Sequence, residues 1–142
     1  METNNKLFSS LKLYFVLLII EGILGISSLF FETNNAFIGI ISLIISILSI
    51  VLLIWSIIII RKVLIYKLSP KKILLVLPIA IIAFSVMAFS LGVYSGFLSQ
   101  EGLQSSTIIQ SSILIFLEYF AQLFYVFQIV FASFVLNKIK RS

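Results

Sequence analysis

Two acidic residues lie inside long apolar runs of the sequence, and they have the clearest potential for chemistry. Glu21 belongs to the run 11–31 and Glu118 to the run 107–136. At about 100° per residue, the spacing i, i+7, i+11 and i+14 keeps side chains on one helix face. Two groups follow this spacing: Tyr14, Glu21, Gly25 and Ser28 in the first run, and Ser111, Glu118, Gln122 and Tyr125 in the second.

Both carboxyl groups fit two interpretations. They are either proton or cation sites, or hydrogen-bonded struts that fix helix register or contact a partner subunit. Lipid offers no hydrogen-bond partners, so we expect the other apolar runs to pack around the run 107–136 and cover its polar face. A low dielectric disfavours charge, so we expect at least one of Glu21 and Glu118 to be protonated at pH 7.

The composition excludes most catalytic chemistry. The chain has no His, Cys or Asp. This excludes disulfides, zinc sites of Cys and His, haem held by His or Cys, and Ser-His-Asp or Cys-His catalysis. Gly22 and Gly25 lie inside an apolar run without a preceding strand, so they do not form a phosphate-binding loop. We therefore predict no catalytic residue, no metal site, no cofactor and no enzymatic activity; a lipid-modifying enzyme would need an unusual mechanism.

The apolar content predicts an integral membrane protein. The chain has 142 residues, of which 61% are hydrophobic, and its mean hydropathy is +1.25. Four apolar runs, about 11–31, 36–60, 73–98 and 107–136, exceed the roughly 20 residues that cross a bilayer. We predict one all-α membrane domain over residues 1–142, a four-transmembrane-helix bundle of two hairpins without a soluble domain. The first run lacks an A-x-A-like cleavage site, which favours an uncleaved helix over a signal peptide.

The distribution of charge predicts the orientation. All ten Lys and Arg residues lie at the N-terminus, between the second and third runs, or at the C-terminus, whereas the other two loops carry only Glu32 and Glu101. The positive-inside rule then places both termini and the middle loop in the cytoplasm. The net charge of +5 is interpreted as flanking charge, and no nucleic-acid partner is expected. The abundance of isoleucine hints at a prokaryotic genome, hence at a prokaryotic cytoplasmic membrane.

Basic and aromatic residues near the ends of the runs are interpreted as membrane contacts. We expect eight basic side chains to meet anionic lipid headgroups, with an acidic cytosolic partner as the alternative: Arg61, Lys62, Lys67, Lys71, Lys72, Lys138, Lys140 and Arg141. The aromatic residues Tyr14, Trp55 and Tyr66 are expected to anchor helices at the interface.

Small residues form stripes that are typical of helix-packing seams. Membrane helices associate where small residues allow close approach. The residues assigned to such seams are Gly25, Gly39, Ser42, Ser46, Ser49, Ala83, Ser90 and Gly92. The facing helix can belong to the same chain or to another protomer, and a serine-lined solute path is the alternative.

The segment Glu21-Gly22-Ile23-Leu24-Gly25 resembles the first span of small multidrug resistance transporters, which are short four-span proteins with an essential Glu in that span. The resemblance implies proton-coupled transport through Glu21. The sequence departs from that family's pattern in three ways. Gly25 lies four residues after Glu21, whereas the family has a Gly three residues after its Glu. The distribution of Lys and Arg is strongly biased to one side of the membrane, and Glu118 has no counterpart in the family's pattern.

Two functions follow from these features. The first is a non-catalytic structural or assembly subunit of a membrane complex or homo-oligomer, whose partners are the bilayer and other membrane subunits or further copies of itself. The alternative is a small proton- or cation-coupled transporter or channel that uses Glu21 and Glu118.

Overall fold

The computed structural model describes residues 2–30, 36–68, 71–101 and 104–141. Within these residues the chain forms α1 (Glu2–Ser27), a 3-10 turn η1 (Ser28–Phe30), α2 (Ala36–Ile65), α3 (Lys71–Glu101) and α4 (Gln104–Arg141). All four α-helices are long and apolar enough to cross a membrane, which confirms the prediction of an all-helical protein with four candidate spans. The helices extend beyond the apolar runs, because α1 begins in the polar leader and α2 continues into the basic segment.

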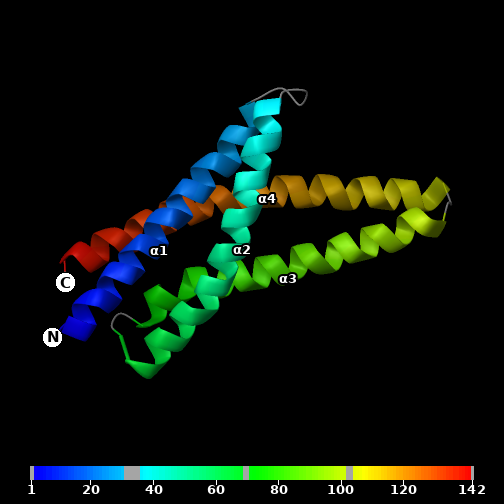
Figure 1. Cartoon of the computed structure of the whole chain (residues 1–142). Coiled ribbons are helices and arrows are strands. Elements are labelled where there is room, and N and C mark those ends of the chain that lie inside the picture. Colours follow the sequence, from blue (N-terminus) through cyan, green and yellow to red (C-terminus); the bar gives the residue numbers. More distant parts are fainter. Residues whose placement is uncertain (1, 31–35, 69–70, 102–103, 142) are drawn as a thin grey trace.

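The helices form two hairpins, α1–α2 and α3–α4, that meet at one end and diverge at the other (Figure 1). The N-terminal ends of α1 and α3 and the C-terminal ends of α2 and α4 lie at the end where the hairpins meet. There α1 packs against α4, and α2 packs against α3. The molecule is therefore a four-helix bundle near its termini and two separate helix pairs further away.

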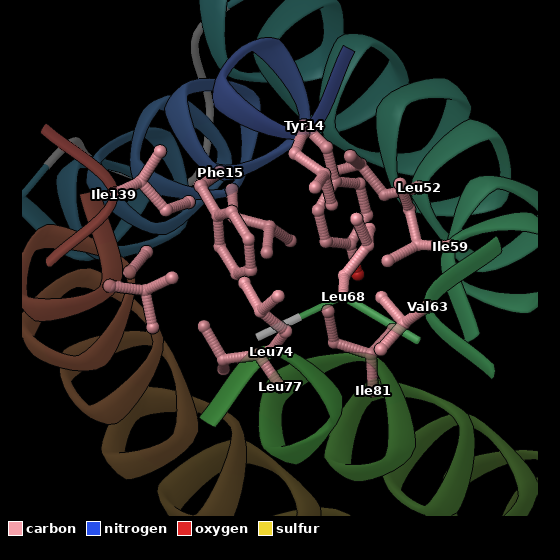
Figure 2. Packing of buried hydrophobic residues seen from close by; sticks show 14 of the residues in the cluster. Tyr14, Phe15, Leu52, Ile59, Val63, Leu68, Leu74, Leu77, Ile81 and Ile139 are labelled. Carbon is pink, nitrogen blue, oxygen red and sulfur yellow. The ribbon is translucent and has the colours of Figure 1, made fainter. Parts of the chain in front are cut away.

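The apolar core lies in the part of the molecule where all four helices come together (Figure 2). Each helix contributes residues spaced three or four apart, which places them on one face. The core includes Leu11, Tyr14, Phe15 and Leu18 of α1, Leu52, Ile59 and Val63 of α2, Leu74, Leu77 and Ile81 of α3, and Ala132, Val135 and Ile139 of α4. In a bilayer such a core stabilises through close packing, because lipid tails are as apolar as these side chains.

Aromatic stacking joins α3 to α4 beyond this core. The ring of Phe84 in α3 stacks on Phe124 at 4.6 Å and on Phe120 at 5.7 Å between ring centroids. Phe120 and Phe124 are four residues apart, so Phe84 contacts side chains from two successive turns of α4. This contact holds the second hairpin together where it moves away from the first.

The C-terminus of α2 ends in a Schellman-type cap. The backbone N–H of Leu68 donates to the carbonyl of Val63 at 3.2 Å, and Lys67 has a φ of 47°. This left-handed conformation usually falls to glycine, because a Cβ atom is strained there. Leu68 then turns its side chain into the core, which fixes the direction in which the chain leaves α2.

The expectation that the other three spans surround the fourth is wrong. Ser111 and Glu118 in α4 are exposed, and only a small part of the apolar stretch of α4 is buried. The physical reason is the divergence of the hairpins, which leaves α3 as the neighbour of this half of α4 (Figure 1).

Candidate functional site

Glu21 lies at the centre of a polar site that connects three helices. Its side chain in α1 is only 6% exposed. The hydroxyl of Ser49 in α2 donates to Oε1 of Glu21, and Nε2 of Gln128 in α4 donates to Oε2 at 2.9 Å. The same Nε2 donates to the backbone carbonyl of Leu18 at 2.7 Å. Both carboxyl oxygens therefore have partners from other helices.

The register of each helix brings these groups inward. In α1, Leu11, Tyr14, Leu18, Glu21 and Gly25 follow one another at alternating spacings of three and four residues, so Glu21 continues the buried face. Similar spacings connect Ser49 to the buried face of α2 and Gln128 to that of α4. The polar site is thus an extension of the apolar core toward the diverging ends of the hairpins.

Two glycines allow α4 to come close to α1 beside Glu21. A Cβ atom added to Gly25 would lie 2.5 Å from Cε2 of Tyr125, and one added to Gly22 would lie 2.6 Å from Cγ1 of Ile129 and 3.2 Å from the carbonyl oxygen of Tyr125. The distances of 2.5 and 2.6 Å are shorter than real Cβ atoms show to other atoms, and 3.2 Å is an unusually tight contact. The glycines are therefore a condition for the contact between Glu21 and Gln128.

A cavity of about 60 Å³ lies beside the carboxyl group of Glu21. Its wall comes from all four helices: Glu21, Ser49, Leu52, Ile81, Phe84, Ser85, Phe124, Tyr125 and Gln128. Liquid water occupies about 30 Å³ per molecule, so the volume suits one or two water molecules or one small cation. The lining offers a carboxyl group, hydroxyls and an amide, which can bind a proton or a cation; it contains no Cys or His that could act as nucleophile or base.

A second polar contact joins α1 to α2 about two helical turns from Glu21. The hydroxyl groups of Tyr14 and Ser56 lie 2.6 Å apart, and Ser56 Oγ donates to the carbonyl of Leu52 at 2.7 Å. Because the single hydroxyl hydrogen of Ser56 points to Leu52, Tyr14 is the donor in the first bond. The expectation that Tyr14 anchors the helix at the interface is wrong, because its side chain is fully buried in the core.

The structure brings together only some of the candidate polar residues. Tyr125 lines the cavity with Glu21. Ser28 in η1 donates to the carbonyl of Gly25 in the last turn of α1. Gln122 is half-buried, and Glu118 is exposed in the N-terminal half of α4. Glu21 and Glu118 therefore do not share a site.

Gln128 and Ser85 line the cavity at Glu21, although helix-face spacing did not assign them to that site. Gln128 stands about 80° from Glu118 around α4, so that spacing excludes it. A different face of the same helix identifies Gln128 as buried. On that face Gln128 is followed by Ala132, Val135 and Ile139 at spacings of four, three and four residues.

The assigned packing residues divide into two groups. Gly25 and Ser49 lie at the contacts of α1 with α4 and α2. The others are exposed on this single chain: Gly39, Ser42, Ser46, Ala83, Ser90 and Gly92. Their role as seams stays a prediction.

The basic residues assigned to lipid headgroups lie toward the end of the molecule that holds both termini (Figure 1). Arg61, Lys67, Lys71, Lys72 and Lys138 are exposed and Lys62 is half-buried. The side chains of Lys140 and Arg141 lie outside the described set.

The chain matches no protein family model, and neither curated proteins nor solved structures show significant similarity to it. The fold and the site indicate an integral membrane protein. It has four helices long and apolar enough to span a membrane, and a polar cavity lies where these helices meet.

Proposed function

We propose that the chain is a non-catalytic integral membrane subunit that assembles with other membrane polypeptides or with copies of itself. The observation that carries this proposal is the exposure of Glu118 within the apolar stretch Thr107–Ile139 of α4. A carboxyl group that faces hydrocarbon is costly, and such groups normally face protein or water. A partner helix beside Glu118 would supply the missing hydrogen-bonding group.

The surroundings of Glu118 support an assembly role. Ser111 and Ser112 are exposed on the same half of α4, and Ser90 and Gly92 are exposed on α3. Small residues allow close helix approach in membranes. Within the described part of the chain these residues are exposed on the half of α3 and α4 where the two hairpins diverge (Figure 1).

The assembly role is tested by native mass spectrometry of the protein extracted gently from its own membrane. The expected result is a mass above that of one chain for the wild type, and a shift toward the single chain for Glu118→Leu. Ser133→Ala is the matched control, since Ser133 is exposed on the other half of α4 and donates to its own helix at Ile129. A wild-type protein that is recovered only as a single chain would contradict the proposal.

We propose that both termini and the α2–α3 connection face the cytoplasm, in a prokaryotic cytoplasmic membrane. The support is the confinement of all ten basic residues to the termini and to the segment between α2 and α3, which lie at one end of the molecule. The chain has no Cys, so single substitutions report orientation cleanly. In intact cells an impermeant maleimide should label Ser99→Cys and leave Lys72→Cys unlabelled; the reverse pattern would overturn the orientation.

A second candidate function is proton- or cation-coupled transport, favoured by the polar cavity at Glu21. For this function, the wild-type protein in liposomes should conduct a proton or cation flux. Glu21→Gln should abolish the flux, and Glu118→Gln should preserve it. Glu118 is the matched control because it is the other acidic residue within an apolar stretch and lies outside the cavity.

A further inference from the structure

The cavity beside Glu21 collects oxygen donors from all four helices. Glu21 supplies a carboxylate, Ser49, Ser85 and Tyr125 supply hydroxyls, and Gln128 supplies a carboxamide. Nε2 of Gln128 donates to both Leu18 and Glu21, so its carboxamide oxygen is the atom left to accept or ligate. Hard cations prefer oxygen ligands of these kinds.

The charge at the site favours one positive charge. Among the described residues that line the cavity, Glu21 is the only charged one. Lys12, the basic residue nearest to it in the sequence, lies nine residues away, about 14 Å along α1. A carboxylate buried without a counter-charge is expensive. A monovalent cation makes the site neutral, whereas a divalent ion leaves a net positive charge in a low-dielectric surrounding.

The donor set also argues against a divalent metal. The described part of the chain has no group of three His, Cys, Asp or Glu side chains that could hold one. One carboxylate with several neutral oxygens in about 60 Å³ suits a single small ion that has lost most of its water.

We propose that the cavity binds one monovalent cation of the Na⁺ type, with Glu21 as the counter-charge and Ser49, Ser85 and Gln128 among its neutral ligands. These residues come from α1, α2, α3 and α4, so the bound ion connects the two hairpins. The binding site goes beyond the assembly role, because it requires only the folded chain. It would also supply the coupling ion of the transport candidate.

Isothermal titration calorimetry with NaCl tests the site, using the full chain in lipid nanodiscs at pH 8 and constant ionic strength set by N-methyl-D-glucamine chloride. The wild type should bind Na⁺ saturably. Glu21→Gln should lose roughly 100-fold or more in Na⁺ affinity, because it removes the buried counter-charge. Ser133→Ala, whose side chain is exposed on α4 outside the cavity, should bind like the wild type.

A second pair of variants keeps the test decisive if Glu21→Gln does not fold. Ser85→Ala removes one neutral ligand and should weaken Na⁺ binding about tenfold. Ser99→Ala is its control, because Ser99 is exposed on the same helix and donates to the carbonyl of Gly96. Absence of saturable Na⁺ binding by the wild type, or equal affinities for Ser85→Ala and Ser99→Ala, would overturn the proposal. Heats that vary with pH but not with Na⁺ would overturn it in favour of a proton site.

Discussion

Gln128 donates to the carboxyl group of Glu21 across 107 residues of sequence, and this bond connects the first helix to the last. The bond also joins the two hairpins, because α1 belongs to one and α4 to the other. With the bond from Ser49 it gives each carboxyl oxygen of Glu21 a partner. The stability of the bundle and the geometry of its cavity therefore depend on the same few side chains.

Replacing Gln128 by Leu should destabilise the folded bundle by about 1–3 kcal/mol, because a buried carboxyl oxygen loses its hydrogen-bond donor. Unfolding in detergent can be followed by the fluorescence of Trp55, the single Trp of the chain, which contacts Tyr14 in the core. The control is Gln110→Leu in the N-terminal half of α4, which should change the stability by no more than about 0.5 kcal/mol. Equal stability of the two variants would contradict this role of Gln128.

Replacing Gly25 by Ala should cost about 1–3 kcal/mol, because the new methyl group would overlap the ring of Tyr125. The cost should fall when the ring is removed, so Gly25→Ala should be milder in a Tyr125→Ala background. A double-mutant cycle on unfolding free energies measures this coupling. Gly92→Ala is the control: a Cβ atom there meets no other group within 4 Å, and Ala favours the helix.

The bond from Tyr14 to Ser56 predicts an asymmetry between two substitutions. Tyr14→Phe should cost about 1 kcal/mol, because Ser56 keeps its bond to Leu52. Ser56→Ala should cost more, up to about 3 kcal/mol, because it leaves the buried hydroxyl of Tyr14 without its acceptor. Unfolding titrations of both variants and of the double variant check the order; a larger loss for Tyr14→Phe would mean that Tyr14 is not the donor.

Lys67→Gly should stabilise the protein by up to about 1 kcal/mol, since glycine adopts the positive φ at the end of α2 without strain. Lys72→Gly provides the comparison: it removes the same charge in the first turn of α3, where glycine weakens a helix. Thermal unfolding of the two variants in the same detergent should therefore shift in opposite directions. A loss of stability in Lys67→Gly would contradict the assignment of the cap.

The four candidate spans could be predicted from the sequence, because apolar length alone decides which segments are long enough to cross a bilayer. The inward position of Glu21 could also be predicted, since it shares the spacing of Tyr14 and Gly25. The partners of Glu21 could not. Ser49 is one of several serines in a similar stripe, and only the register of α1 against α2 selects it.

The exposure of Glu118 could not be predicted either. Its face has the same spacing as that of Glu21, so helix periodicity treats the two carboxyl groups alike. They differ because the hairpins diverge before α4 reaches Glu118 (Figure 1). That divergence depends on which helices pair, and in a membrane this pairing is set by close packing across helices far apart in the chain, such as α1 with α4.

Because the first helix pairs with the last, the site at Glu21 can be completed only after the whole chain has been synthesised. Ser49 follows Glu21 by 28 residues and Gln128 follows it by 107, so the two partners of the carboxyl group leave the ribosome at different times. At 5–20 residues per second, Gln128 is made about 5–20 s after Glu21. During that interval the first hairpin must keep the acid group satisfied through Ser49 alone, and the last helix to be made completes the site.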